Sequence, residues 1–313
     1  LAAIAREVGG DKVEAVALAR GDYDPHQVAA YPSLMVEANK ADLFVEIGLE
    51  LELWAEHIID GARNPKIRRT EPGHVWAAAG VHVVEKPAEL SRAQGDVHPN
   101  GNPHVWNDPP NAIVEARNIA DGLARVDPAN QAYYDARFED FKARVERALF
   151  GEDLVKTIGA PTLMKLLEKG TLADFLASKK YKGKPLADRL GGWYGKMWPC
   201  RGAKVFSFHK EFSYFARTFE LDVVANLEPK PGIPPTPGHL EELEKIAREQ
   251  PIRAVIIAPY NNVALTEGFC KKTGIPLCVV PTDVGGTEDA RDYFSLMDGE
   301  VNRIAEAIQK SGK

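Results

Sequence analysis

An alternation of short apolar runs with helix-like segments constrains the fold of this chain more than any other sequence feature. Such runs, four to six residues long, are typical of buried strands, and amphipathic patterns of helical period separate most of them. Strand–helix alternation of this kind predicts an α/β protein with mostly parallel sheets flanked by helices. The predicted strands are Val13–Leu18, Leu43–Ile47, Val81–Val84, Lys204–Phe208, Leu221–Val224, Ala254–Ile257 and Leu277–Val280. The predicted helices include Pro32–Asn39, Leu51–Ala62, Asn111–Arg125, Glu211–Phe219 and His239–Gln250.

The middle of the chain interrupts this alternation. Residues Pro128–Phe150 contain no strand pattern and carry an aromatic and aliphatic stripe at three- and four-residue spacing, which predicts one long amphipathic helix. We therefore expect two α/β lobes joined by a rigid helix. The expected boundaries are 1–127 for the N-terminal lobe, 128–150 for the connecting helix and 151–313 for the C-terminal lobe. A short helical insertion is expected at about 151–189.

Charge and hydropathy narrow the class of partner. The 313-residue chain has a formal net charge of −6, and its basic runs are short, so we expect no binding to nucleic acid. It contains no stretch of about 18 apolar residues, the length that a membrane-spanning helix requires. We expect a soluble monomer.

The three cysteines do not form a Cys-x-x-Cys pair, which argues against a thiolate zinc site. Cys270 and Cys278 are separated by a predicted turn. They could form a disulfide in an oxidising compartment or remain two buried thiols, while Cys200 would stay unpaired.

Three of the eight histidines stand where predicted elements begin or end. His26 follows the first predicted strand, His104 precedes a helix and His209 ends the strand Lys204–Phe208. Ligands of parallel α/β sheets bind at the carboxyl ends of strands, and three imidazoles with one further oxygen make a tetrahedral zinc site. Asp283 follows the last predicted strand and could supply that oxygen. The remaining histidines are expected to be structural or solvated: His57, His74, His82, His98 and His239.

These motifs resemble those of the periplasmic metal-binding proteins of zinc and manganese ABC importers, the ZnuA/TroA-like group. The resemblance covers nearly the whole chain. Its most specific elements are Asp24-Pro25-His26, then Asn102-Pro103-His104-Val105-Trp106-Asn107-Asp108-Pro109, then His209 before an aromatic helix. Further matching stretches are Ile4–Asp11, Ala41–Val45 and Ser207–Phe215.

The resemblance implies two α/β lobes joined by a long helix, with a metal ion in the cleft between them. It implies His26, His104 and His209 as ligands, together with a carboxylate of the last lobe. In this family the third ligand is often Glu in manganese carriers and His in zinc carriers, so His209 favours Zn²⁺, with Mn²⁺ as the alternative. The resemblance also implies delivery to a membrane ABC permease and a periplasmic or other extracytoplasmic location, with the signal peptide removed.

The sequence departs from the family pattern in three places. The family's first strand normally precedes the segment that begins at Leu1, so the resemblance implies that this strand is missing from the sequence. The long histidine-rich loop of many zinc carriers is absent, and only His98 stands in its place; we expect it to be solvated, with a vestige of the loop or an accessory capture ligand as the alternatives. The usual Asp-Pro-Leu-Gly motif reads Pro281–Gly286, with the carboxylate displaced by about one position, so Glu228 or water could replace Asp283 as the fourth ligand.

Two other classes of protein remain open at this stage. A zinc-dependent hydrolase would keep three protein ligands and an open water position, with a base such as Glu211 nearby. However, no His-Glu-x-x-His motif occurs, and Glu211 is explained equally well as an acid in the first turn of a helix. A structural adhesin would use the metal only for folding. A carrier would bind zinc reversibly, stay folded without it and show no hydrolytic activity.

Overall fold

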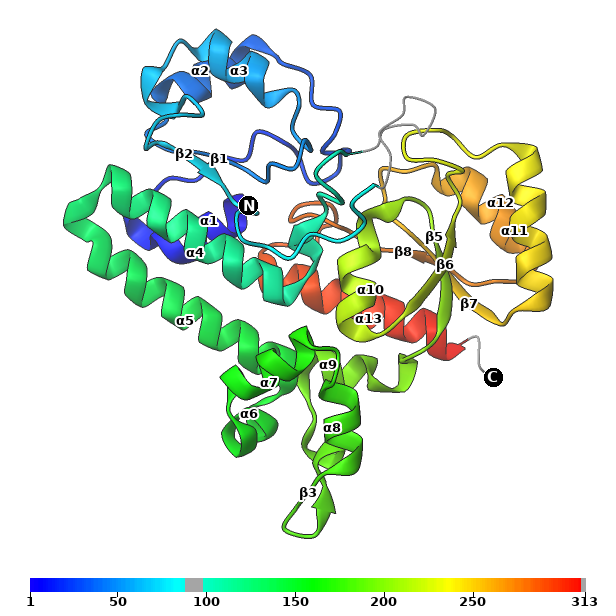
Figure 1. Cartoon of the computed structure of the whole chain (residues 1–313). Helices are drawn as coiled ribbons and strands as arrows, with labels where there is room; N and C mark the ends of the chain where they lie inside the picture. Colours follow the sequence, from blue (N-terminus) through cyan, green and yellow to red (C-terminus); the bar gives the residue numbers. More distant parts are fainter. Residues whose placement is uncertain (88–97, 311–313) are drawn as a thin grey trace.

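Two separate parallel sheets form the frame of the protein, one in each lobe (Figure 1). The computed structural model describes residues 1–87 and 98–310. In the N-terminal lobe, β1 (Phe44–Glu46) pairs with β2 (His74–Trp76). The C-terminal lobe has the strand order β6-β5-β7-β8, and every neighbouring pair is parallel. These four strands are β5 (Lys204–Ser207), β6 (Asp222–Asn226), β7 (Ile252–Ile257) and β8 (Leu277–Val279).

Two predicted strands of the N-terminal lobe are wrong. Val13–Leu18 is not a strand: Val16 is exposed, and the Ala15 carbonyl accepts a hydrogen bond from the Arg6 side chain instead of a neighbouring strand. Val81–Val84 is not a strand either: the Val84 carbonyl accepts from the Asn102 N–H, and the Val84 N–H donates to the Tyr214 hydroxyl. An apolar run therefore becomes a strand only where a partner strand lies beside it. Sequence reasoning also missed β2, which is only three residues long.

Helices α1 (Ala2–Gly9), α2 (Pro32–Lys40) and α3 (Ala55–Ala62) belong to the N-terminal lobe. The helix predicted at Leu51–Ala62 begins four residues later than predicted, at Ala55. Glu52 lies in the preceding turn, where its carboxylate accepts hydrogen bonds from the backbone N–H groups of Ile47 and Gly48. Leu49 and Glu50 have positive φ angles of 56° and 66°, which places a turn rather than a helix here.

Helices α4 (Pro109–Val126) and α5 (Gln131–Phe150) lie side by side beneath the N-terminal lobe, joined by a 3₁₀ turn (Pro128–Asn130) (Figure 1). The long helix predicted for this region is therefore present and begins three residues later. Its stripe is buried at Tyr134, Phe138, Phe141, Val145 and Leu149. One continuous apolar core includes this stripe together with residues of α1, α4, β5 and α13 (Tyr293–Lys310). Because that core extends beneath both lobes, the lobes are packed against a common rigid base.

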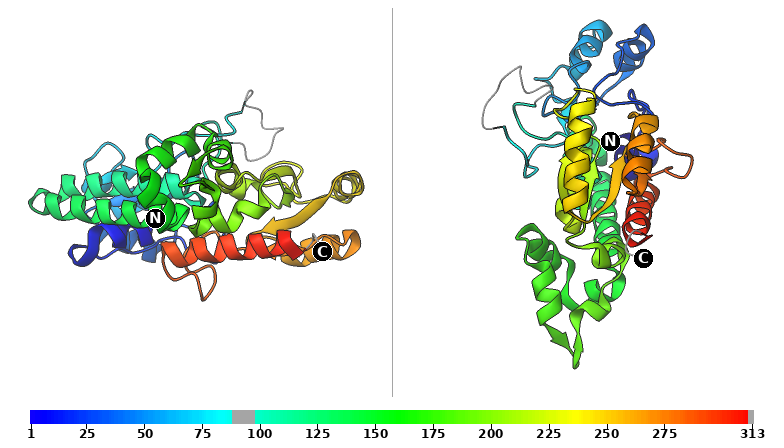
Figure 2. Two further views of the ribbon diagram at one scale, coloured as in Figure 1. Left: turned by 90° about the horizontal axis from the view of Figure 1, so that it is seen from below. Right: turned by 90° about the vertical axis from the view of Figure 1, so that its right-hand side faces the viewer.

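Residues 151–189 project away from both lobes (Figures 1 and 2). They form α6 (Glu152–Ile158), α7 (Ala160–Glu168), α8 (Leu172–Ser178) and the antiparallel pair β3 (Lys180–Tyr181) and β4 (Lys184–Pro185), followed by a 3₁₀ turn (Leu186–Arg189). The chain enters and leaves this segment at Gly151 and Gly191. A Cβ atom on Gly151 would lie 2.7 Å from the Gly191 Cα, so the close crossing of the two backbones requires glycine.

In the C-terminal lobe, alternate residues of the central strand β7 face opposite sides of the sheet. Val255 and Ile257 pack beneath α11 (Pro237–Glu249) and α12 (Val263–Thr273), whereas Ala254 and Ile256 pack toward α13. Helix α11 begins two residues before the predicted His239–Gln250, with the Thr236 hydroxyl accepting from the His239 N–H and Pro237 in the first turn. The remaining helices are α9 (Gly192–Met197) and α10 (Ser213–Phe219).

Cys200, Cys270 and Cys278 are buried free thiols. Cys270 packs in the core beneath α11 and α12, while Cys278 packs in the core on the opposite side of the sheet. Of the two alternatives for Cys270 and Cys278, the structure has the pair of thiols. In the part of the chain that the structure describes, no helix is long and apolar enough to cross a bilayer.

Candidate metal centre

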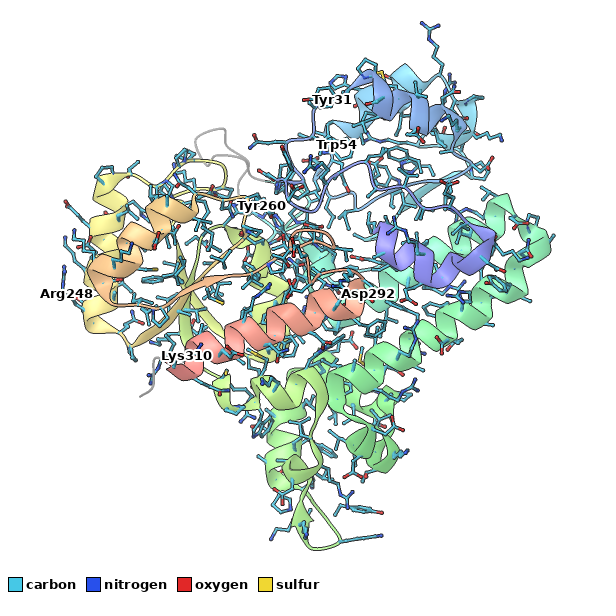
Figure 3. The ribbon with its side chains drawn as sticks, turned by 180° about the vertical axis from the view of Figure 1, so that it is seen from behind. Tyr31, Trp54, Arg248, Tyr260, Asp292 and Lys310 are labelled. Carbon is cyan, nitrogen blue, oxygen red and sulfur yellow. The ribbon has the colours of Figure 1, made fainter. Side chains whose placement is uncertain are left out.

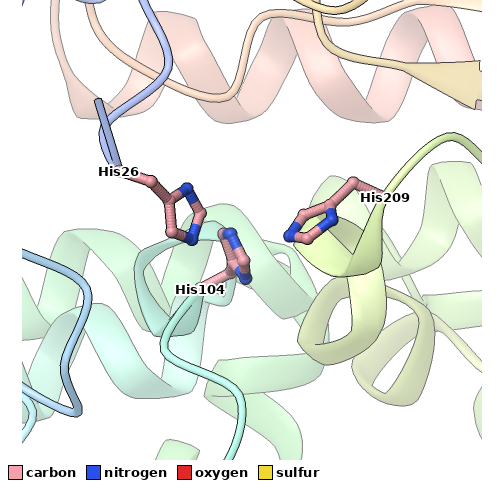
Figure 4. Close-up of side chains that lie close together, drawn as sticks. All are labelled: His26, His104 and His209. Atoms are coloured by element: carbon pink, nitrogen blue, oxygen red, sulfur yellow. The ribbon is translucent and has the colours of Figure 1, made fainter. Parts of the chain in front are cut away.

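Three histidines from separate loops converge between the lobes (Figure 4). His104 stands directly before the 3₁₀ turn Val105–Asn107, and His209 stands between β5 and the 3₁₀ turn Lys210–Phe212. His26 lies in the loop that leads to α2, not directly after a strand as expected. One nitrogen from each ring lies within 4.8 Å of the other two, and the ring centroids are 5.0 to 5.6 Å apart. The structure thus brings together three of the four predicted ligand residues.

Each of the three rings is oriented by a hydrogen bond at Nδ1. His26 Nδ1 lies 2.8 Å from Asp24 Oδ1, and His209 Nδ1 lies 2.7 Å from Glu228 Oε2. His104 Nδ1 lies 2.8 Å from Asn102 Oδ1. The Asn102 amide nitrogen donates to the Lys210 carbonyl, so its oxygen is the atom that faces His104 and accepts the Nδ1 proton.

These partners fix the tautomer. When Nδ1 carries the proton, Nε2 of a neutral imidazole has a free lone pair, and this is the form that binds metal ions. The Nε2 atoms of His104 and His209 are buried and have no hydrogen-bond partner within residues 1–87 and 98–310. Buried polar nitrogens are almost always paired, so two such atoms facing each other favour a cation between them.

Burial and charge act differently on the three rings. Burial, reinforced by the neighbouring histidines, lowers the pKa of His104 well below its ordinary value, so this ring is neutral and ready to bind a metal. Burial has the largest single effect on His209 and would lower its pKa, but the hydrogen bond to Glu228 and the charges of nearby carboxylates together outweigh it, so the pKa is raised. Burial would raise the pKa of Asp24, but the hydrogen bond from His26 and its charge lower it, so Asp24 remains a carboxylate.

The segment around His104, in the N-terminal lobe, is hydrogen-bonded to the C-terminal lobe. Trp106 Nε1 donates to the Thr282 carbonyl at 2.8 Å, and the Tyr214 hydroxyl donates to the Asn102 carbonyl at 2.7 Å. The Asn102 side chain adds its bond to the Lys210 carbonyl. His104 is therefore held at a fixed place relative to the loops that carry His209 and Asp283.

Asp283 lies outside the set of mutually close ligand atoms that the three histidines form. Its carboxylate accepts a hydrogen bond from the Thr282 hydroxyl at 3.1 Å, and this hydroxyl lies 3.2 Å from that of Tyr260. Figure 3 shows Tyr260 where the C-terminal lobe faces the N-terminal lobe. Burial raises the pKa of Asp283 to about 6.

Two other acidic residues, Glu228 and Glu211, were considered in the sequence analysis. Glu228, considered as a replacement ligand, binds the Nδ1 side of His209, opposite the nitrogen that faces the other rings. Glu211 lies in the first turn of a 3₁₀ helix, as its interpretation as a first-turn acid expected, and it is completely buried: Asn261 donates to one of its oxygens, and the other has no partner among the residues described. Sequence reasoning did not anticipate Asp24 and Asn102 as ring-orienting residues. The sequence feature that could have indicated this role is that each stands two residues before a histidine, in two matching Asx-Pro-His motifs.

The other histidines follow the prediction with one exception. His57 and His82 are exposed, His74 bonds to Glu46 inside the N-terminal lobe, and His239 bonds to the Asn226 carbonyl. His98 was expected to be solvated, but it is half-buried, and its Nε2 lies 3.3 Å from His26 Nε2.

Two α/β lobes on a shared base, with imidazole nitrogens converging between them, define a two-lobed binding protein. A family model described as ZnuA, the periplasmic component A of a zinc-uptake complex, matches residues 1–149 and 188–307. The chain belongs to this family of substrate-binding transport proteins, which excludes the alternative of a zinc hydrolase. The unmatched residues 150–187 include the projecting α6–α8 and β3–β4.

Relatives and solved structures agree with this assignment. The manganese ABC transporter substrate-binding lipoprotein PsaA of Streptococcus anginosus is 20% identical over 99% of this chain and 87% of its own length. The PsaA protein of Streptococcus pneumoniae is 22% identical over 99% and 86%. A crystal structure of ZnuA superposes with a TM-score of 0.70 at 20% identity, covering 98% of this chain and 94% of that one. The substrate-binding protein FpvC of Pseudomonas aeruginosa, solved with Mn²⁺, gives 0.69 at 21% identity, covering 99% and 95%. These likenesses establish the two-lobed fold.

Proposed function

We propose that this protein captures a divalent transition metal ion between its lobes and delivers it to the membrane permease of an ABC importer. The observation that carries the proposal is the convergence of His26, His104 and His209, each with Nδ1 occupied by an oxygen acceptor. The names of the relatives, which are metal and manganese ABC transporter substrate-binding lipoproteins, support the transport role. They also support a periplasmic or other extracytoplasmic location.

Zinc is the ion that this set of donors favours. Imidazole nitrogen suits zinc, copper, iron and nickel, whereas the harder manganese ion prefers carboxylate and water oxygen. Nitrogens bound to one tetrahedral zinc ion are about 3.3–3.4 Å apart, so rotations of the three rings would bring atoms that now lie within 4.8 Å to that spacing. We propose Zn²⁺ as the cargo, Mn²⁺ as the alternative, and the Asp283 carboxylate as the oxygen ligand from the C-terminal lobe.

The site is also suited to small movements on release. Hydrogen bonds from Trp106 and Asn102 cross between the lobes, and the apolar core extends beneath both. We propose that the N-terminal lobe comprises residues 1–127, the connecting helix 128–150 and the C-terminal lobe 151–313. We also propose that the metal leaves through a local shift of the C-terminal lobe. Crystal structures with and without metal test this, and a large rigid-body rotation of one lobe would contradict it.

Calorimetric titration of the metal-free protein with zinc and with manganese tests the function. We expect one zinc ion per chain, bound more tightly than manganese, and loss of that binding in His104→Ala. The matched control is His57→Ala, which removes an exposed histidine on α3 and should bind zinc like the unmodified protein. Unchanged zinc binding in His104→Ala would refute the assignment of the site.

A further inference from the structure

A fourth imidazole lies against the three-histidine cluster. His98 stands just before the segment that carries His104, and its Nε2 lies 3.3 Å from the Nε2 of His26. The two ring centroids are 5.3 Å apart, which is within the 5.0 to 5.6 Å range that separates the rings of the cluster itself. His98 therefore approaches His26 as closely as the predicted ligands approach one another.

The atoms in contact are the ones that matter for metal binding. Because Asp24 accepts the Nδ1 proton of His26, the Nε2 atom of His26 presents a lone pair. His98 directs its own Nε2 at that same atom. The distance of 3.3 Å is that of a long hydrogen bond, since those donated by nitrogen usually span about 2.7–3.2 Å. It equals the separation of about 3.3–3.4 Å between two nitrogens that share one tetrahedral zinc ion.

We propose that His98 is an additional ligand, so that four imidazoles, those of His26, His98, His104 and His209, surround the bound metal. This inference rests on the proposed function and deepens it. His98 lies outside the set of mutually close nitrogens, so binding of the ion by all four imidazoles requires its half-buried ring to turn toward His104 and His209. With Asp283 as an oxygen ligand, the ion becomes five-coordinate, a number that zinc can adopt.

A fourth nitrogen has a consequence for selectivity. Each imidazole added to a site favours ions such as zinc, nickel and copper over manganese. The side chain at position 98 then contributes to the choice of metal as well as to its affinity. Removal of His98 should weaken zinc binding more than manganese binding.

X-ray absorption spectroscopy of the zinc-loaded full chain tests this inference, because it counts the imidazoles bound to the ion. The variant is His98→Gln, and the control is His57→Gln, which alters an exposed histidine on α3. We expect four imidazoles in the unmodified protein and in the control, and three in His98→Gln. The Kd for zinc should rise by roughly tenfold or more in His98→Gln, since changes to residues that merely support metal ligands already cost about 10–100-fold. An unchanged thermal unfolding curve of the metal-free variant would show that the fold is intact.

The outcomes separate this inference from the proposed function. Three imidazoles in both the unmodified protein and His98→Gln would overturn the role of His98 and leave the three-histidine centre in place. No stoichiometric zinc binding by the unmodified protein would overturn the proposed function and this inference together. A larger loss of affinity for manganese than for zinc in His98→Gln would contradict the argument on selectivity.

Discussion

The hydrogen bond between Glu228 and His209 offers a quantitative test of how the protein prepares a ligand. Glu228 Oε2 lies 2.7 Å from His209 Nδ1 and also accepts from the Gly232 N–H at 3.1 Å. Both side chains are largely buried, with 13% of Glu228 and 15% of His209 exposed. A metal ion at Nε2 makes the Nδ1 proton more acidic, so this hydrogen bond is stronger in the metal-bound state than in the empty one.

The substitution Glu228→Gln removes the charge and keeps an oxygen acceptor of similar size. A hydrogen bond to a charged group contributes about 1.5–3 kcal/mol and a neutral one about 1 kcal/mol. Because this bond exists with and without the metal, only its strengthening on metal binding changes the Kd. If that strengthening is about 1 kcal/mol smaller with the neutral acceptor, the Kd for zinc is roughly fivefold higher. Glu228→Leu removes the acceptor and should approach the upper part of the range of about 10–100-fold seen for residues that support metal ligands.

Competition calorimetry against a chelator of known affinity measures this change. The control is Glu249→Gln, which neutralises an exposed acid at the end of α11 and leaves the site alone. Equal zinc affinity in Glu228→Gln, Glu228→Leu and the control would refute the reasoning that the Nδ1 partner prepares His209 for metal.

Three further predictions concern acidity, thiol reactivity and packing. The pKa of His209 is raised, so protons compete with zinc for its Nε2 atom already at a pH above the pKa of a free imidazole. Zinc affinity measured by titration should therefore fall as the pH decreases, and Glu228→Gln should move this fall to lower pH. Burial raises the pKa of Cys270 and Cys278 to about 12, so thiol reagents at pH 8 should label them only after unfolding; rapid labelling of the folded chain would contradict this. Phe141→Ala removes a fully buried ring from the core beneath both lobes. It should lower the free energy of unfolding, measured by denaturant titration, by about 3–5 kcal/mol. A loss below about 1 kcal/mol would mean that this core does not support the fold.

The sequence predicts the elements of the C-terminal lobe better than those of the N-terminal lobe, for a physical reason. All four predicted strands of the C-terminal lobe are present within a residue or two, because each apolar run has a paired neighbour in the same sheet. The long helix is predicted equally well, since its buried residues from Tyr134 to Leu149 keep helical spacing throughout. Val13–Leu18 has the same local pattern as a strand but no partner strand, and local pattern contains no information about pairing.

For the candidate site, too, the sequence predicted the residues but not the contacts between distant parts of the chain. Position at the ends of predicted elements singled out His104 and His209, and also His26, although the strand predicted before His26 is absent; the three side chains meet between the lobes. The contact between His98 and His26 joins residues 72 positions apart, and that between Glu228 and His209 depends on the parallel pairing of β6 with β5, which continues where the Glu228 N–H donates to the Phe208 carbonyl. No spacing rule predicts either contact, because both depend on how the loops pack.

The central claim is that one metal ion binds where the three histidines converge. A crystal structure of the zinc-loaded chain, with anomalous scattering recorded at the zinc edge, tests it most directly. We predict a single strong anomalous peak at about 2.0–2.1 Å from the Nε2 atoms of His26, His104 and His209. A zinc peak elsewhere on the chain, or none between the lobes at stoichiometric loading, would contradict the account.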